Sequence, residues 1–306
     1  MTEKIAILCS DLHLSHTPPL ARSGEPDWYK AMARPLRELN DLVSDIQSPL
    51  VLCGGDVFDR WNCPPKLITF AMQTLPDNFN SVMGQHDLPY HSWEQRESSA
   101  FWTLEEADIV DLASRWGKYK RVAWCGFQWG EEIEDNNSGW GDAITVCIAH
   151  QYVWWGNAKE STIATEKNSL SYSLEKLQGY DVALFGDNHK GFLETRIPGV
   201  IFNAGTFMRR HSDEKSYKPM VGLLYEDGTV KPYYLDTSED VFDSSEEVHE
   251  AEQVLLNLDS FLDGLQKLGE TGLDFRRAVD AAMDREQVSR VVRRVILEAM
   301  EKSDEA

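Results

Sequence analysis

Short runs of apolar residues recur along the first three quarters of the chain. Runs of this length, rich in Val, Ile, Leu and Cys, are typical of buried β-strands. The expected strands are 5–9, 50–53, 81–83, 121–127, 144–149, 182–185, 200–203 and 221–225, and a hairpin turn at 225–229 leads into one more strand that ends near Leu235.

A different spacing of apolar residues separates the first of these runs. Within 28–46, Met32, Leu36, Leu39 and Val43 recur at helical intervals, and 65–75 opens with a proline, which suits the first turn of a helix. Strands that alternate with helices predict an α/β core.

The pattern changes after position 235. Residues 236–252 are acidic and contain serines, so we interpret them as a boundary between a body, 1–239, and a tail, 240–306. Within the tail, 254–268 and 275–300 show the spacing of two amphipathic helices. Two helices cannot bury an apolar face alone, so they either pack as a hairpin on their own domain or dock onto a partner helix.

Composition places the chain among ordinary globular proteins. Of its 306 residues, 42% are hydrophobic and 26% are charged, and no apolar run approaches the ~20 residues that cross a bilayer. The first apolar run, 5–9, is too short for a secretory signal, and the five cysteines form no CxxC pair. These features predict a cytoplasmic protein with no membrane association.

The net charge of −21 argues against a broad nucleic-acid-binding surface, because such surfaces are usually basic. The charge is unevenly distributed, however. Residues 236–306 carry a net charge of −11, which leaves −10 on the rest of the chain. The body is therefore less repulsive to phosphate than the total suggests.

Five clusters of side chains that can bind metals each follow an expected strand. The clusters are Asp11-Leu-His13, Gly55-Asp56-Val-Phe-Asp59, Gly84-Gln85-His86-Asp87, Ala149-His150-Gln151 and Gly186-Asp187-Asn188-His189. Ligands of α/β sheets gather outside the carboxyl ends of the strands, so these loops are expected to converge on one crevice. Each cluster alone is a weak signal, but their conjunction predicts a metal site.

This series resembles the calcineurin-like metallophosphoesterase superfamily, whose signature is DxH, GDxxD, GNHD/E, a later His and GHxH. Within it, the chain is most similar to SbcD-type nucleases of double-strand-break repair, particularly bacteriophage versions. The closer cues are GQHDLP at 84–89, GDNH at 186–189 and FNAGTFMRR at 202–210. The likeness covers about residues 4–235. It implies a layered β-sandwich flanked by helices, with a C-terminal helical appendage.

The resemblance also implies a pair of divalent cations and a role for each cluster. One metal would be held by Asp11, His13, Asp56 and His189, and the other by Asp56, Gln85, His150 and Asp187, with Asp56 as the bridge. His86 would contact the scissile phosphate or protonate the leaving oxygen, and Asp87 would orient His86. Two adjacent cations can clamp a phosphate and activate water. Oxygen and imidazole ligands suit Mn²⁺ best, with Mg²⁺ as the alternative.

Two positions depart from the superfamily pattern, and both fall on the second metal. Gln85 replaces the usual Asn, and Asp187 replaces the first His of GHxH. Both replacements keep a donor oxygen, and Asp187 adds negative charge. The site is therefore either functional and shifted toward Mn²⁺ or Mg²⁺, or it binds its second metal weakly or not at all.

Four further residues are predicted to contact nucleic acid. Trp154 and Trp155 follow His150 closely and either stack on an unpaired base or lie buried. Arg209 and Arg210 form a basic island in an acidic chain, which indicates either phosphate-backbone contacts or a solvated turn.

The sequence thus predicts a metal-dependent nuclease domain over 1–239. The resemblance implies the DNA nuclease subunit of an SbcCD-like complex in a bacterial or phage-infected cell. It also implies a homodimer and an SbcC-like ATPase whose coiled coil meets the tail helices. Two alternatives stay open. A small-molecule phosphodiesterase or phosphatase shares the metal motifs and fits the acidity, and a degenerate site on a partner-binding scaffold fits the two departures.

Overall fold

The computed structural model describes residues 2–46, 50–136, 140–159, 164–195, 199–243, 245 and 248. Both expected tail helices, 254–268 and 275–300, lie outside these residues, so the boundary at 239/240 stays a prediction. The chain divides into two compact units. The first comprises Met1–Thr17, Asp27–Arg209 and Tyr217–Asp240, and the second comprises Pro18–Pro26, Arg210–Ser216 and Val241–Ala306. All five sequence clusters belong to the first unit.

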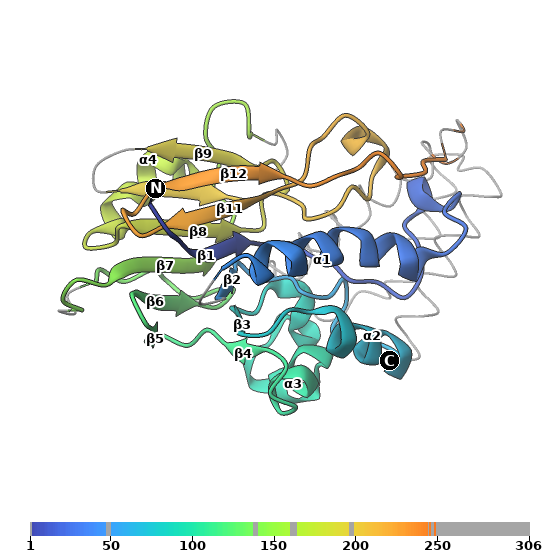
Figure 1. Ribbon diagram of the computed structural model, residues 1–306, viewed down its shortest axis with the longest axis horizontal. Coiled ribbons are helices and arrows are strands. Elements are labelled where there is room, and N and C mark those ends of the chain that lie inside the picture. The colour runs from blue at the N-terminus through green and yellow to red at the C-terminus, as the bar shows by residue number, and fades with distance from the viewer. Residues whose placement is uncertain are drawn as a thin grey trace, which may run out of the picture. The chain divides into compact units, whose positions relative to one another are not determined.

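The first unit contains two six-stranded sheets, both visible in Figure 1. In the first sheet the strand order is β12-β11-β1-β2-β3-β4. Strands β1 to β4 run parallel, whereas β11 pairs antiparallel with β1 and β12 antiparallel with β11. The strands are β1 Lys4–Cys9, β2 Val51–Cys53, β3 Phe79–Ser81, β4 Asp111–Leu112, β11 Met220–Tyr225 and β12 Val230–Tyr234.

The second sheet has the order β5-β6-β7-β8-β10-β9. Its four inner strands are parallel, and the two edge strands pair antiparallel with their neighbours. The strands are β5 Gly117–Tyr119, β6 Val122–Phe127, β7 Ile144–His150, β8 Val182–Gly186, β9 Phe192–Thr195 and β10 Val200–Asn203.

The sheets pack face to face because their inner strands are apolar on both faces. In β1, Ala6 and Leu8 point into a core shared with β7 and β8, while Ile7 and Cys9 point into a second core under the helices. On the far face of the second sheet, residues such as Cys147 lie in a third core. The predicted layered sandwich flanked by helices is confirmed.

In the part of the chain that the structure describes, four α-helices accompany the sheets. They are α1 Trp28–Ser44, α2 Pro65–Thr74, α3 Ala100–Glu105 and α4 Leu170–Ser173. The Asp27 side chain caps α1 by accepting a hydrogen bond from the backbone of Lys30, and Met32, Leu36, Leu39 and Val43 are buried as the spacing predicted. Among the described residues, no helix combines the length and apolar character needed to cross a membrane.

Several short 3₁₀ segments connect these elements. They are η1 Leu20–Arg22, η2 Gln85–Asp87, η3 Pro89–His91, η4 Trp93–Ser98, η5 Glu166–Asn168, η6 Leu174–Leu177 and η7 Ser212–Glu214. Three of them, η2, η3 and η4, follow one another between β3 and α3, and η2 is part of the third cluster.

The expected strands differ from the observed ones in two respects. The third strand was expected at 81–83 but runs from Phe79 to Ser81, and Val82 and Met83 form the buried approach to the Gly84 turn. Strands β4, β5 and β9 were not predicted. They have two to four residues, which is too short for a periodic pattern to emerge.

The second unit is held together by a buried ion pair. The guanidinium of Arg22 bonds to Glu25, donates from Nε to the carbonyl of Val241 at 3.2 Å, and lies over the Phe242 ring. The backbone of Val241 in turn donates to Glu25 Oε1 at 3.0 Å. Hydrogen bonds and a cation–π contact thus join the segment 18–26 to Val241 and Phe242.

Candidate metal centre

The five clusters lie where parallel strands end. Asp11 and His13 follow β1, Asp56 follows β2, and Gln85 to Asp87 follow β3. His150 is the last residue of β7, and Asp187 and His189 follow β8. Because β1, β2 and β3 are parallel, as are β7 and β8, the clusters of each sheet emerge at one edge, as the sequence predicted.

The four residues predicted to hold the first metal come together. His13 Nε2 lies 3.0 Å from His189 Nε2 and 3.6 Å from Asp56 Oδ2. The Asp11 Oδ1 atom lies 3.9 Å from His13 Nε2 and 3.8 Å from His189 Nε2. Donor atoms that share one ion, each with a bond of ~2.1 Å, are separated by distances of this order.

The second predicted set joins the first through Asp56. Its Oδ2 atom lies 3.3 Å from His150 Nε2, so this single oxygen faces both His13 and His150. Gln85 Nε2 donates to Asp187 Oδ1 at 2.8 Å, and the backbone N–H of Asp187 donates to Asp11 Oδ1 at 3.1 Å. Asp56 therefore occupies the position between the two sets that the resemblance implied for a bridging ligand.

Asp56 Oδ2, Gln85 Oε1 and His150 Nε2 are buried, and none of them makes a well-formed hydrogen bond, although Asp56 Oδ2 and His150 Nε2 lie 3.3 Å apart. The other polar atoms of the same side chains are bonded. Asp56 Oδ1 accepts from the backbone of His86, and His150 Nδ1 donates to the Gly54 carbonyl at 2.6 Å. Buried polar atoms are rarely left unsatisfied because their desolvation is costly. Two oxygens and an imidazole nitrogen form a donor set that fits a divalent cation.

The charges of the cluster also favour a cation. Burial raises the pKa of Asp11 to about 7, and Asp56 and Asp187 add to the shift while His150 opposes it. Burial likewise raises the pKa of Asp187. Burial alone would raise the pKa of Asp56, but His150 and His86 outweigh it and lower this pKa to about 2. Several carboxylates thus compete for compensating positive charge, which a divalent ion supplies.

His86 stands at the open side of the cluster. Its side chain is 42% exposed, whereas those of His13, Asp56 and His150 are buried. Its Nδ1 donates to the Asp59 carbonyl at 2.9 Å, and its Nε2 lies 4.0 Å from Asp56 Oδ2. The Asp59 carbonyl thus fixes which ring nitrogen faces the centre.

Asp87 acts on the backbone. Its carboxylate accepts hydrogen bonds from the N–H groups of Val57, Phe58 and Gly84, at 3.0 to 3.2 Å. It therefore joins the turn after β2 to the turn after β3. That Asp87 orients His86 stays a prediction. Asp87 could do so only indirectly, by holding the backbone of the turn on which His86 lies.

Local backbone strain marks the same positions. Asp11, His13, Asp56 and Asp187 all have positive φ angles, of 53°, 45°, 53° and 78°. Left-handed conformations are uncommon for residues other than glycine, and they cluster at functional sites. At Gly84, a Cβ atom would lie 2.0 Å from Asp56 Oδ1, so only glycine lets this turn approach the carboxylate.

The sequence analysis missed the backbone acceptors of the site and one hydroxyl. The carbonyls of Gly54 and Asp59 hold His150 and His86, and Ser10 Oγ donates to Asp11 Oδ2 at 2.5 Å. Every residue carries a carbonyl, so sequence offers no signal for the first two. The serine precedes the DxH motif directly and could have been noticed. The Asp59 carboxylate lies beside a predicted ligand, with Oδ1 3.8 Å from His13 Nδ1.

The residues predicted to contact nucleic acid are already engaged in the protein. Trp154 Nε1 donates to the carbonyl of Thr165 at 2.8 Å, and Trp155 packs against the third core. The Arg209 guanidinium bonds to Asp240 Oδ2 at 2.9 Å, and Arg210, which belongs to the second unit, is buried. Their role in binding DNA stays a prediction, and Arg209 would have to leave Asp240 to contact a phosphate.

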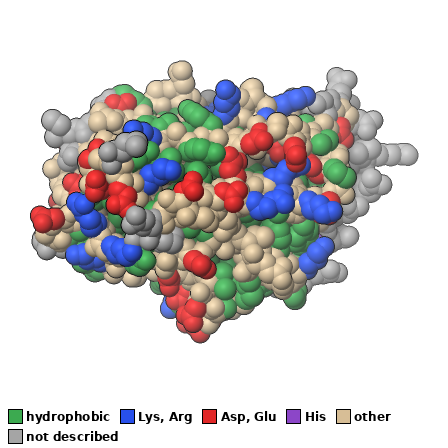
Figure 2. All heavy atoms as spheres, in the orientation of Figure 1, with side chains coloured by type: hydrophobic (Ala, Val, Ile, Leu, Met, Phe, Trp, Pro, Cys, Tyr) green, Lys and Arg blue, Asp and Glu red, His purple; other side chains and the backbone are tan. Residues whose placement is uncertain are grey.

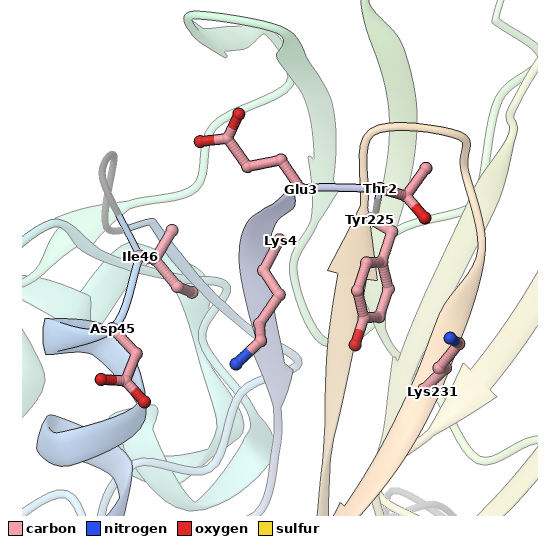
Figure 3. Close-up of a pocket in the computed structure, with 7 residues that line it drawn as sticks. All are labelled: Thr2, Glu3, Lys4, Asp45, Ile46, Tyr225 and Lys231. Atoms are coloured by element: carbon pink, nitrogen blue, oxygen red, sulfur yellow. The ribbon is translucent and has the colours of Figure 1, made fainter.

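A separate hollow of about 420 Å³ lies at the other end of β1, beside its first residue Lys4 (Figure 3). It is lined by Thr2, Glu3, Lys4, Asp45, Ile46, Tyr225 and Lys231. It combines acidic and basic groups and carries none of the five clusters, so it is not part of the metal centre.

The carboxylates and histidines gathered at the strand ends of this α/β sandwich form groups that can hold metal ions, as in a metal-dependent enzyme. The sequence pattern of the family described as Calcineurin-like phosphoesterase matches residues 6–191, and the chain belongs to this family. The match includes all five clusters. No curated protein sequence matches the chain.

Solved structures show distant likeness. A putative 5′-nucleotidase from Staphylococcus aureus has a TM-score of 0.46 and 13% identity, over 82% of this chain and 58% of that chain, so this chain spans little more than half of that protein. The calcineurin-like phosphoesterase YfkN from Bacillus subtilis has a TM-score of 0.44 and 11% identity, over 88% and 100% of the two chains. A novel archaeal phosphodiesterase has a TM-score of 0.39 and 13% identity, over 75% and 99%. At this level of similarity, these proteins do not identify a substrate.

Proposed function

We propose that this protein is a metal-dependent phosphodiesterase that cleaves DNA, as the nuclease subunit of an SbcCD-like complex. The observation that supports the phosphodiesterase most directly is the set of three buried atoms on Asp56, Gln85 and His150 that make no well-formed hydrogen bond, next to the partly exposed His86. The choice of DNA rests on the resemblance of the GQHDLP and FNAGTFMRR segments to SbcD-type nucleases.

The chain's own residues would hold two divalent cations in the arrangement that the resemblance implies. When bound, the cations supply Lewis-acid stabilisation of the phosphate and lower the pKa of water. Asp56 is ionised at neutral pH because its pKa is about 2. The Gly54 carbonyl accepts a hydrogen bond from His150 Nδ1, so that Nε2 would offer its lone pair to a bound cation.

His86 is the group placed to handle a proton. With Nδ1–H bonded to the Asp59 carbonyl, Nε2 is the nitrogen that faces the centre and the solvent. A protonated Nε2 would donate to a phosphate oxygen or to the leaving oxygen, and its charge would be stabilised by the nearby Asp56.

The proposed metal is Mn²⁺, with Mg²⁺ as the alternative. Gln85 and Asp187 form a hydrogen-bonded pair, so both departures from the superfamily pattern lie in one part of the centre. Each contributes oxygen where the superfamily has an amide oxygen or an imidazole nitrogen. A site with more oxygen donors favours harder cations.

The proposed partners follow from the resemblance alone. They are DNA, a second copy of the chain, and an SbcC-like ATPase whose coiled coil would meet the tail helices, which lie outside the described residues.

A small-molecule phosphodiester is the second candidate substrate, and the charge of the chain favours it. The net charge is −21, and acidic and basic side chains are interspersed on the face shown in Figure 2. A small substrate needs no extended basic surface, whereas a duplex usually does.

Purified full-length protein with Mn²⁺ tests these proposals. We expect cleavage of single- or double-stranded DNA that a chelator abolishes and that His86→Ala strongly reduces. Cleavage of cyclic nucleotides or p-nitrophenyl esters but not of DNA would replace the nuclease with the small-molecule enzyme. Absence of hydrolysis of all these substrates, with a partner still bound, would establish the scaffold.

A further inference from the structure

Two aromatic side chains stand close together on the turns that also supply residues of the metal centre. The rings of Trp61 and Tyr90 have centroids 5.4 Å apart and planes inclined by 47°. Tyr90 is 61% exposed, so one face of its ring is open to solvent. The pair comes from two different turns, one after β2 and the other after β3, and each turn also supplies a residue of the centre.

Both residues lie within short reach of His86. Tyr90 is four residues after His86, so their Cα atoms are at most ~15 Å apart at 3.8 Å per residue. Trp61 is two residues after Asp59, whose carbonyl bonds to His86 Nδ1. A nucleobase is separated from its own phosphate by one sugar, so a base beside a phosphate at His86 falls within this range.

The backbone presents the Tyr90 ring in an unfavourable conformation. Tyr90 and His91 both have positive φ, of 52° and 55°, and neither is glycine. The His91 ring turns to Trp129, with centroids 5.3 Å apart, while the Tyr90 ring stays largely in solvent beside Trp61. The strained backbone at Tyr90 therefore holds its ring in solvent, where the ring gains no stabilisation from burial.

The turn that carries Trp61 is bonded to α3, and Arg96 holds the segment that follows Tyr90. The Trp61 carbonyl accepts a hydrogen bond from the backbone of Ala100, at the start of α3, at 2.8 Å. Arg96 lies against the rings of Trp93 and Trp102, at 4.6 and 4.9 Å, and donates to the Trp93 carbonyl. Aromatic rings on a backbone that is held in place lose less conformational entropy when a flat ligand stacks on them.

We propose that Trp61 and Tyr90 form a stacking platform for a nucleobase of the substrate, next to the phosphate at the metal centre. This inference rests on the proposed phosphodiesterase and specifies its substrate as a nucleotide ester, in a strand or free. Aromatic faces stack on every base, so the platform predicts dependence on a base but little dependence on its sequence.

Kinetics in Mn²⁺ with a short single-stranded DNA and an abasic strand of the same length test the platform. Tyr90→Leu is expected to raise KM for the base-bearing strand about tenfold, within the range of one stacked base, and to leave KM for the abasic strand unchanged. Trp61→Leu is expected to act in the same direction. Tyr90→Phe retains the ring and is expected to behave as the wild type.

Tyr234→Leu is the matched control. Tyr234 is 56% exposed, and it lies on β12 at the sheet edge, separated from β3 by β11, β1 and β2. It should leave both KM values unchanged. Unaltered thermal midpoints for the Tyr90 variants would show that the fold is intact. Equal KM changes for the two strands, or none for the base-bearing strand, would overturn the platform.

A binding measurement separates this inference from the proposed function. Calorimetry in Mn²⁺ compares a nucleoside monophosphate with an abasic sugar phosphate, and needs no hydrolysis. Base-dependent binding that Tyr90→Leu removes, without hydrolysis of any ester, would reject the proposed function and support the platform. Hydrolysis without base dependence would reject the platform alone.

Discussion

At the scale of single residues, Asp56 occupies the central position in the metal centre. It is buried, its Oδ2 faces His13, His150 and His86, and that atom makes no well-formed hydrogen bond. Its ionised form is stabilised by histidines, whereas its neighbour Asp11 has a raised pKa.

Asp56→Asn is expected to reduce metal affinity and hydrolysis by at least about a hundredfold, because it removes the charge that both predicted metals share. Calorimetric titration with Mn²⁺ measures the loss. Asp45→Asn is the control, since Asp45 is an exposed carboxylate at the other end of β1. Wild-type Mn²⁺ affinity in Asp56→Asn would remove this residue from the centre.

His86→Ala is expected to lower kcat by roughly a hundredfold or more while leaving the number of bound metals unchanged, because His86 is placed to transfer a proton. Metal content and kcat are measured on the same preparation. Donor atoms of His13, Asp56 and His86 also lie close enough to hold one ion. Loss of one metal in His86→Ala would therefore make His86 a ligand.

Asp187→Ala is expected to reduce the metal stoichiometry by one, because Asp187 is bonded to Gln85 in the second predicted site. Asp142→Ala, at an exposed turn, serves as the control. An unchanged stoichiometry would place Asp187 outside the metal centre, and Gln85 would then lose its proposed partner in metal binding.

At the scale of elements, the centre depends on turns that follow short strands. β2 and β3 have three residues each, so the strands alone fix the following loops weakly. Asp87 supplies the missing connection by accepting three backbone hydrogen bonds from the two turns. The geometry around His86 thus depends on a residue that does not itself face the centre.

Asp87→Ala is expected to destabilise the protein by about 3 kcal/mol, because three buried N–H groups lose their acceptor. It should also lower kcat, since the backbone of His86 is released. Denaturant unfolding gives the first quantity, and steady-state kinetics give the second. A variant as stable as the wild type would mean that water or other groups satisfy these N–H groups equally well.

At the scale of the whole molecule, the buried charges predict how stability varies with pH in the absence of metal. Burial raises the pKa values of Asp11 and Asp87 from 3.8 to about 7, and the pKa of His150 is also raised, because Asp56 outweighs its burial. The folded protein therefore binds protons more tightly than the unfolded chain. Its stability is expected to fall as pH rises from about 4 to about 7.

The pH dependence of stability is measured as the thermal unfolding midpoint between about pH 4 and pH 7, once with a chelator and once with Mn²⁺. Mn²⁺ should flatten the dependence because the cation replaces the bound protons. General repulsion in an acidic chain acts in the same direction, so Asp11→Asn is the control and should reduce the slope. A metal-free midpoint that rises with pH would contradict the expected protonation of these groups.

The sequence by itself indicated which side chains gather at the strand ends and on which kind of element they lie. Apolar runs give strands by local chemistry, and residues such as Asp11, Asp56 and His150 directly follow or end them. Parallel strands then bring the clusters of each sheet together at one edge, whereas the packing of the two sheets brings the two groups of clusters to each other. The layered α/β fold could be predicted as well, because the alternation of strands and helices follows from the local spacing of apolar residues.

Only the tertiary structure decided how those side chains are held. The Gly54 carbonyl beneath His150, the Asp59 carbonyl beneath His86 and the role of Asp87 all depend on backbone groups brought close from distant positions. The engagement of Arg209 by Asp240 is of the same kind. Backbone carbonyls are common to every residue, so such contacts leave no mark in the sequence. They are set by strand register and by the close approach of turns, which exist only in the folded chain.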